Sequence, residues 1–352
     1  MQRRAKGAGI VGGIAAATVG AVAAGFELER RVVTRRLRPK SLDTSRFFGM
    51  TGDRVLVGTS DGLELHAEID EAPQAGSDAL TVVFVHGYVL SRHCWYFQRQ
   101  SLRGKRRVVV YDQRSHGDSD LAPAASCRVP QLAEDLRSVL AATTREDERV
   151  VLVGHSMGGM TIMDYARRFP EEFGTKVAGV GLVATSSGNL SQHSIVPGVP
   201  GPVFASLAPH LITVFNRAPR AFDRARRVGT DVGAVATQRM AYGANVAPEL
   251  VEFMVQMIAA TSVTVMGDFY PAFAEFDGRE GLTVIGGVET MITGGARDSI
   301  LPVVHTKTLI DRLPGAESWI DPRQGHMHFI GNPEPVNDML QALLWRADRS
   351  RR

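Results

Sequence analysis

The chain has 352 residues, of which 44% are hydrophobic and 22% charged, as is ordinary for a folded protein of one or two domains. Its two cysteines, Cys94 and Cys127, exclude a disulfide framework and fit no metal-ligand spacing. The net charge of +3 arises at the N-terminus, because residues 1–40 hold nine Lys or Arg against two Glu, whereas the remainder holds 31 basic and 35 acidic residues. This balance argues against nucleic acid as a partner.

Residues 7–26, GAGIVGGIAAATVGAVAAGF, form a stretch of twenty residues without a charged side chain. Its length fits a membrane span, although Ala and Gly make it only weakly hydrophobic. A cleaved secretory signal ending near Ala21–Ala23, and a helix that packs on the protein, are the alternatives. More positive charge follows the stretch than precedes it, which favours a membrane anchor with the rest of the chain on the cytoplasmic side.

Strand patterns and helix patterns alternate along the following residues. Continuous apolar runs predict buried strands, and apolar residues three or four positions apart predict helices. Strands and helices that alternate at this spacing predict an α/β fold with a mostly parallel sheet, covered by helices on both faces. In chain order we expect a hairpin at 53–70, strands at 79–87 and 108–111, a helix at 129–143, a strand at 148–154, a helix at 157–169 and a strand at 177–187.

The alternation stops after residue 187 and resumes with strands at 286–295 and 317–322. Residues 188–278 contain three prolines near their start and long apolar stretches, but no further buried-strand pattern. We therefore expect a largely helical insertion within one α/β domain, which residues 50–187 and 279–345 form together.

The sequence Gly154-His155-Ser156-Met157-Gly158 lies between a predicted strand and a predicted helix. G-x-S-x-G in this position indicates a nucleophile elbow, a sharp turn that holds a serine hydroxyl above the carboxyl edge of the sheet. Glycines are needed there because larger side chains would collide with the neighbouring strand and helix. Ordinary turns also satisfy this pattern by chance, and it is the flanking strand and helix that favour a nucleophile.

A nucleophilic serine requires a general base, and the base requires an acid that orients it. Asp298 follows the strand predicted at 286–295, and His326 follows the strand predicted at 317–322. Because the carboxyl ends of parallel strands meet at one edge of the sheet, both side chains should lie on the same edge as Ser156. The order Ser, Asp, His along the chain is the order that this architecture uses.

Each of these two residues has an alternative interpretation. Asp298 could instead cap a helix that begins near Leu301. His326 could be an exposed loop residue, with His328 as the competing base. Gly325 favours His326, because a glycine directly before the base permits the close approach that the base needs.

Acyl transfer also requires two N–H donors that stabilise the oxyanion. The amide of Met157 lies at the N-terminus of a predicted helix, where N–H groups have no intrahelical partner. Residues 86–88, His-Gly-Tyr, end a predicted strand, and we expect the amide of Tyr88 to be the second donor. We expect His86 to be structural and hydrogen bonds to stabilise the polar loop at 112–119. No metal or cofactor is predicted.

Several of these motifs together resemble those of the α/β-hydrolase superfamily, over about residues 50–345, with the insertion where that family places its lid or cap. The resemblance implies Ser156 as nucleophile, His326 as general base and Asp298 as acid. It also implies Tyr88 and Met157 as oxyanion donors. The motifs are HG at 86–87, DQRSHGDS at 112–119, GHSMGG at 154–159, GGARD at 294–298 and GHM at 325–327.

The resemblance implies a serine hydrolase that cleaves carboxylic esters through an acyl-enzyme. Serine at position 156 argues against the epoxide hydrolase and haloalkane dehalogenase branches, which use aspartate there. The N-terminal stretch favours a small lipid-derived or other acyl ester as substrate. We expect the apolar residues within 250–258 to form mainly the core of the insertion, with some lining the entrance. A thioesterase or a cofactor-free perhydrolase would use the same residues, and a non-catalytic binding protein on the same fold is a further alternative.

Overall fold

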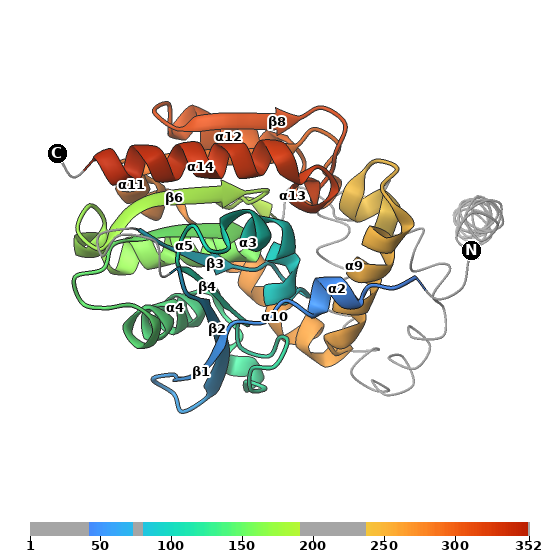
Figure 1. The fold of residues 1–352 in the computed structure, drawn as a ribbon, viewed down its shortest axis with the longest axis horizontal. Helices are drawn as coiled ribbons and strands as arrows, with labels where there is room; N and C mark the ends of the chain where they lie inside the picture. Colours follow the sequence, from blue (N-terminus) through green and yellow to red (C-terminus); the bar gives the residue numbers. More distant parts are fainter. Residues whose placement is uncertain (1–41, 73–79, 191–236, 351–352) are drawn as a thin grey trace, which may run out of the picture.

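The structure is a computed structural model that describes residues 42–72, 80–190 and 237–350 (Figure 1). Its strands are β1 (Asp53–Gly58), β2 (Glu64–Asp70), β3 (Thr81–Val85), β4 (Val108–Tyr111), β5 (Val150–His155), β6 (Val177–Val183), β7 (Glu289–Gly295) and β8 (Glu317–Asp321). The described strands form one eight-stranded sheet in the order β1-β2-β4-β3-β5-β6-β7-β8. The β1–β2 and β2–β4 pairs are antiparallel, and the other pairs are parallel.

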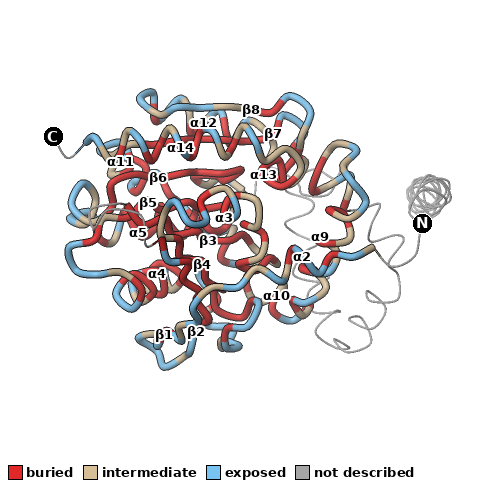
Figure 2. The backbone as a smooth tube through the Cα atoms, viewed as in Figure 1, coloured by how far each residue is buried: buried red, intermediate tan, exposed pale blue. Residues whose placement is uncertain are grey.

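Helices cover both faces of this sheet (Figure 1). They are α3 (Tyr96–Leu102), α4 (Val129–Thr143), α5 (Met157–Arg168), α11 (Arg279–Ile285), α12 (Val304–Arg312), α13 (His328–Gly331) and α14 (Pro333–Arg349), with short turns η1 (Arg92–Trp95), η2 (Ala124–Ser126) and η3 (Pro170–Glu172). Successive residues of a strand point to opposite faces, so the sheet contributes to two apolar cores. One core includes α3, α13 and α14, and the other includes α4, α5, α11 and α12. Figure 2 shows the central strands buried within these layers.

The α/β architecture predicted from the sequence is confirmed. Strand β4 and helix α4 coincide with the predicted ranges. Strand β6 is shorter than predicted and ends at Val183, because Ala184 takes a φ of 43° and leaves the extended conformation. The next residue, Thr185, then donates from its hydroxyl to the carbonyl oxygen of Ser156 at 2.7 Å, which turns the chain toward the end of β5.

Strands β6 and β7 are neighbours in the sheet, so the chain leaves it at residue 184 and returns at 289. The described part of the predicted insertion contains η5 (Gln238–Tyr242), α9 (Pro248–Ala260) and α10 (Val263–Glu275), while residues 191–236 lie outside the described residues. Apolar side chains of α9 are buried, but in the core that they share with α3, α13 and α14 rather than in a separate core of the insertion. Ile258 is partly buried, and each of the following is at most 8% exposed: Leu250, Val251, Phe253, Met254 and Met257.

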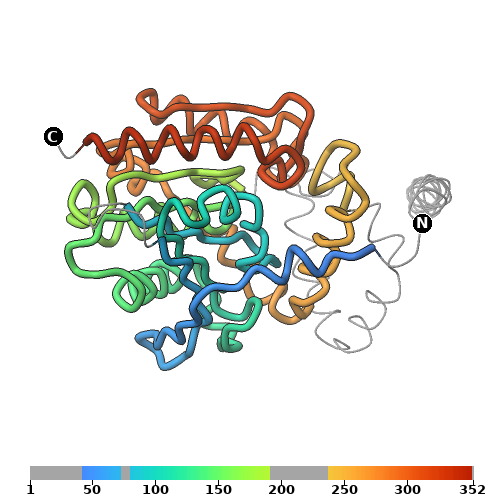
Figure 3. Tube along the Cα trace, in the orientation of Figure 1, coloured from blue at the N-terminus to red at the C-terminus, as the bar shows by residue number. Residues whose placement is uncertain are grey.

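A short helix, α2 (Ser45–Phe48), lies beside α9 at the start of the described chain (Figure 3). The ring of Phe47 stacks on that of Phe253 in α9, with centroids 4.6 Å apart. It also meets the ring of Tyr96 in α3 edge-on at 5.1 Å. Helix α2 therefore packs against both the insertion and the α/β layer.

Among the residues that the structure describes, no single helix is long and apolar enough to cross a membrane. Helices α9 and α10 meet the length and composition requirements together, but a bend of 89° separates them. The stretch at 7–26 lies outside the described residues, so its role as a membrane anchor stays a prediction.

Candidate active site

Ser156 occupies the turn between β5 and α5, and its backbone is strained. Its φ of 52° and ψ of −116° fall in a region that residues other than glycine rarely adopt. Its N–H donates to the carbonyl oxygen of Val183 at 3.0 Å, and its own carbonyl oxygen accepts from Thr185. Strain that the surrounding structure holds at one residue is typical of functional sites.

Close backbone contacts explain the glycines around this serine. A Cβ at Gly154 would lie 2.5 Å from the carbonyl oxygen of Gly158, and a Cβ at Gly158 would lie 2.1 Å from that of Val85. A Cβ at Gly159 would lie 2.6 Å from the side chain of Thr185. Helix α5 can therefore approach β3 and the end of β6 this closely only where it carries glycine, which confirms the interpretation of the motif's glycines.

The structure brings Asp298 and His326 into contact. His326 Nδ1 lies 2.7 Å from Asp298 Oδ2, and the two residues are only 4% and 8% exposed. Because an ionised carboxylate only accepts hydrogen bonds, Nδ1 donates, and Nε2 is left as the acceptor nitrogen. The other oxygen, Asp298 Oδ1, accepts from the amides of Ile300 at 2.9 Å and Leu301 at 2.8 Å. One carboxylate thus stabilises its own loop and orients the histidine, and α12 begins only at Val304.

The ring of His326 lies beside the serine turn. Its centroid is 4.6 Å from that of His155, the residue directly before Ser156. His328 is buried elsewhere, with Nε2 2.9 Å from Thr293 Oγ1, and burial lowers its pKa to about 4. A general base must reach the proton that it removes, so the geometry favours His326 over His328.

The loop after β3 packs directly against the serine. A Cβ at Gly87 would lie 3.2 Å from Ser156 Cβ, so glycine permits this approach. Tyr88 follows in the same loop and is half-buried. Met157 begins α5, and its side chain is fully buried. Of the two predicted oxyanion donors, Met157 therefore follows Ser156 directly in the chain. Tyr88 follows the glycine that packs against Ser156.

Gln113 and His116 fix the shape of this loop, a role that sequence reasoning did not assign to them individually. The backbone N–H of Gln113 donates to His86 Nε2 at 2.8 Å, and its side-chain amide donates to the carbonyl oxygen of His86 at 2.6 Å. The N–H of Val89, whose φ is 56°, donates to His116 Nε2 at 3.2 Å. Burial lowers the pKa of His86 to about 4 and that of His116 to about 3, so both rings stay neutral and can accept. His86 is structural, as predicted.

The end of η5 is hydrogen-bonded to the loops that carry the acid and the base. A Cβ at Gly325 would lie 2.9 Å from the carbonyl carbon of Tyr242, so this glycine permits a close approach of the base's loop to η5. The insertion therefore supports the Asp298–His326 pair from outside the sheet. The contacts are Gly325 N to Tyr242 O at 2.5 Å, Met327 N to Ala241 O at 2.8 Å and Ser299 Oγ to Met240 O at 3.2 Å.

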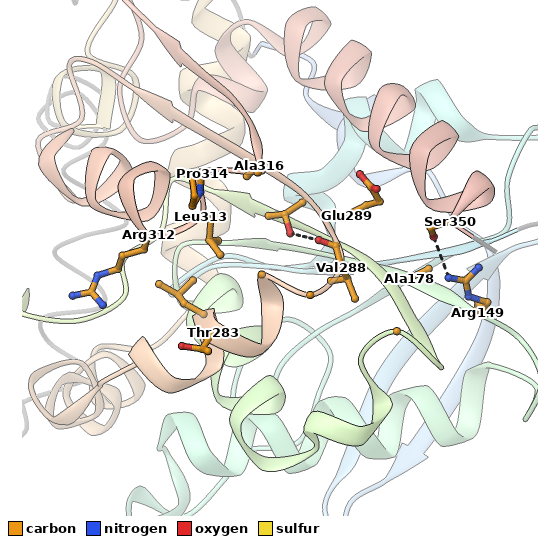
Figure 4. Close-up of a pocket in the computed structure, with 16 residues that line it drawn as sticks. Arg149, Ala178, Thr283, Val288, Glu289, Arg312, Leu313, Pro314, Ala316 and Ser350 are labelled. Carbon is orange, nitrogen blue, oxygen red and sulfur yellow. Dashed lines mark hydrogen bonds between the residues drawn. The ribbon is translucent and has the colours of Figure 1, made fainter. Parts of the chain in front are cut away.

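A cavity of about 660 Å³ lies at the opposite edge of the sheet (Figure 4). Ala178 and Glu289, near the amino ends of β6 and β7, line it. Arg149 borders it and donates to Ser350 Oγ at 3.4 Å. None of the three predicted catalytic residues lines this cavity, so it is separate from the candidate site.

The described residues contain no group of three or more His, Cys, Asp or Glu side chains that could hold a metal ion. Cys94 and Cys127 are free and buried. Burial raises the pKa of Cys94 well above its usual range and that of Cys127 to about 11, so both thiols stay protonated at neutral pH.

A strained serine turn, a histidine–aspartate pair and a mostly parallel sheet that presents all three at its carboxyl edge define the α/β-hydrolase class. Residues 82–339 match the family model described as the alpha/beta hydrolase family, and the chain belongs to this family.

Similar proteins include esterases. Pimeloyl-[acyl-carrier protein] methyl ester esterase of Aeromonas hydrophila is 23% identical over 74% of this chain and 93% of its own length. An uncharacterised protein of Mycobacterium tuberculosis is 24% identical over 75% of this chain and 74% of its own length. The solved esterase of Exiguobacterium antarcticum superposes with a TM-score of 0.66 and 19% identity, over 84% of this chain and 99% of that one. These likenesses support a hydrolase.

Proposed function

We propose that this protein is a serine hydrolase that cleaves carboxylic esters through an acyl-enzyme, with Ser156, His326 and Asp298 as its catalytic triad. One observation carries the proposal: the 2.7 Å contact between His326 and Asp298 lies beside the turn that strains Ser156. A nucleophile, a base and an orienting acid in this arrangement are the parts that acyl transfer by serine requires.

The chemistry follows from the proton positions. Ser156 Oγ attacks the ester carbonyl carbon while His326 Nε2 takes the hydroxyl proton, and Asp298 stabilises the imidazolium that forms. The amides of Tyr88 and Met157 donate to the oxyanion of the tetrahedral intermediate. The carbon–oxygen bond to the alcohol then breaks, and His326 returns the proton to the leaving alcohol. A water molecule, deprotonated by His326, attacks the acyl-enzyme carbonyl. The bond to Ser156 Oγ then breaks, His326 returns the proton to Ser156, and the acid is released.

We propose an acyl ester of lipid origin as the substrate class. The support comes from the apolar composition of α9 and α10 in the insertion and from the uncharged stretch at 7–26. A relative named as a methyl ester esterase supports ester chemistry on an acyl chain.

Hydrolysis of p-nitrophenyl esters from acetate to palmitate tests this function. We expect turnover that peaks at one chain length, because a binding site of fixed depth accepts one acyl length best. Ser156→Ala, purified in the same way, is the control and should show no peak. A correctly folded wild-type protein that hydrolyses none of these esters would contradict the proposed ester specificity.

We also propose that residues 7–26 attach the protein to a membrane, on the grounds of their length and lack of charge. Full-length protein should then float with phospholipid vesicles in a density gradient. The full-length double variant Ile14→Arg, Val19→Arg should stay in solution, because each arginine costs about 2.5–3.5 kcal/mol near the centre of a span. Wild-type protein that stays in solution beside the vesicles would exclude the anchor.

A further inference from the structure

A small apolar cluster joins helix α10 of the insertion to both residues proposed as oxyanion donors. The cluster adjoins one of the two large cores, since Phe273 of α10 packs against both. Met157 contributes a fully buried side chain, and the ring of Tyr88 packs against the edge. The buried members are Cys127, Leu132, Met157, Val265 and Phe269, with Tyr88, Ala122 and Phe273 packed against them.

Tyr88 contacts α10 in two ways. Its hydroxyl donates to the backbone carbonyl oxygen of Met266 at 2.5 Å. Its ring meets that of Phe273 edge-on, with centroids 5.1 Å apart, and lies 6.4 Å from that of Phe269. The side chain of Tyr88 has little freedom to rotate, because its hydroxyl is bonded to backbone and its ring lies between aromatic neighbours. The position of Tyr88 therefore follows that of α10.

The backbone on either side of Tyr88 is hydrogen-bonded to the α/β layer. On one side, Gln113 bonds to the carbonyl oxygen of His86, and on the other, His116 accepts from the amide of Val89. Tyr88, whose amide faces the reaction in the proposed mechanism, lies between these two attachments. Its side chain supplies further contacts, to Met266 and Phe273 of α10 and, with ring centroids 6.3 Å apart, to His116.

We propose that α10 sets the geometry of the oxyanion hole, and that the side chain of Tyr88 is the positioning group through which it does so. This inference rests on the proposed function, and it adds a role for the insertion beyond covering the substrate. When a bound substrate holds α10 in its correct position, the Tyr88 amide is aligned with the developing oxyanion. A substrate that leaves α10 out of position lowers kcat, because an oxyanion donor acts mainly in the transition state.

Tyr88→Phe tests the hydroxyl alone, since the ring and the backbone amide remain. With p-nitrophenyl butyrate we expect kcat to fall by about threefold to tenfold, the effect typical of one neutral hydrogen bond. KM should change by less than about twofold, because uniform binding is not affected. The affinity for a trifluoromethyl ketone should fall by the same factor as kcat, because its adduct with Ser156 carries the same oxyanion.

Tyr165→Phe is the matched control. Its hydroxyl donates to the carboxylate of Glu172, between α5 and η3, and it is remote from the loop of Tyr88. The same atom is removed, so a general loss of stability appears in both variants, as measured by thermal unfolding. Only Tyr88→Phe should alter kcat and the affinity for the ketone.

A second variant approaches the same contact from α10. Phe273→Leu removes the ring that faces Tyr88, and it should also lower kcat and ketone affinity together. Combined with Tyr88→Phe, it should cost little more than the larger single effect, because both changes act through one side chain. This variant keeps the test decisive if Tyr88→Phe folds poorly.

The outcomes separate this inference from the function on which it rests. Wild-type kcat and ketone affinity in Tyr88→Phe, with an active wild-type enzyme, would overturn the role of α10 and leave the proposed function intact. A change in KM alone would also overturn it, since the hydroxyl would then serve substrate binding. A wild-type protein that neither hydrolyses the ester nor binds the ketone would overturn both.

Discussion

Replacing Ser156 by alanine should lower kcat for the best p-nitrophenyl ester by about 10⁴- to 10⁶-fold, because the triad acts as a unit and fails when its nucleophile is lost. The change removes one hydroxyl from a residue that is only partly buried, so the fold should be kept. Initial rates at saturating ester, measured beside the thermal unfolding of both proteins, check this prediction. Residual turnover above the uncatalysed rate is expected from the remaining oxyanion donors.

Ser186→Ala is a demanding control for this experiment. Ser186 Oγ lies 2.8 Å from His305 Nδ1, so the protein contains a serine–histidine contact outside the proposed triad. Ser186 is fully buried and follows β6 rather than β5. Its replacement should leave kcat within about tenfold of wild type, since single hydrogen bonds contribute at most about 1.5 kcal/mol. A loss of rate in Ser186→Ala that equals the loss in Ser156→Ala would remove the case for Ser156.

Replacing Asp298 by asparagine should lower kcat by about 10⁴-fold, as is typical when the acid of a triad becomes an amide. The carboxylate accepts from His326 on one oxygen and from the amides of Ile300 and Leu301 on the other. An asparagine can keep its oxygen on the two amides, and its NH₂ group then faces His326 Nδ1. That nitrogen must become the acceptor, so the proton moves to Nε2 and the ring can no longer take the proton of the nucleophile.

Asp321→Asn is the matched control. Asp321 is the last residue of the parallel strand β8, and its Oδ1 accepts from the amides of Arg323 and Gln324 at 2.8 and 3.2 Å. Its other oxygen accepts from Asn332 at 2.8 Å rather than from a histidine. The Asp321→Asn change should lower the free energy of unfolding. It should reduce kcat by less than about tenfold, because only one hydrogen bond is perturbed. Equal losses in the two variants would show that Asp298 acts by holding its loop.

The α/β layer and the candidate triad could be predicted because their signals are local. A glycine-flanked serine, an aspartate and a histidine each follow a predicted strand, and the parallel sheet brings the three strand ends to one edge. The sequence favoured His326 over His328 because Gly325 directly precedes it, but the contact that this glycine permits, with the backbone of Tyr242, could not be predicted.

The contacts that connect distant segments could not be predicted. The stacking of Phe47 on Phe253 and the bond from Tyr88 to Met266 join residues about two hundred positions apart, and no periodicity records such pairs. The early end of β6 was missed for a related reason. Residues 184–187, Ala-Thr-Ser-Ser, carry no Gly or Pro that would mark the end of a strand, but Thr185 is needed at the serine turn.

Labelling with a fluorophosphonate tests the central claim most directly. Oxygen of an activated serine displaces fluoride from the probe, and mass spectrometry of the digested protein locates the adduct. The account predicts one adduct, on the peptide that contains Ser156, that is lost in Ser156→Ala and retained in Ser186→Ala. An adduct on any other residue of the folded wild-type protein, or none at all, would contradict the assignment of Ser156 as the nucleophile.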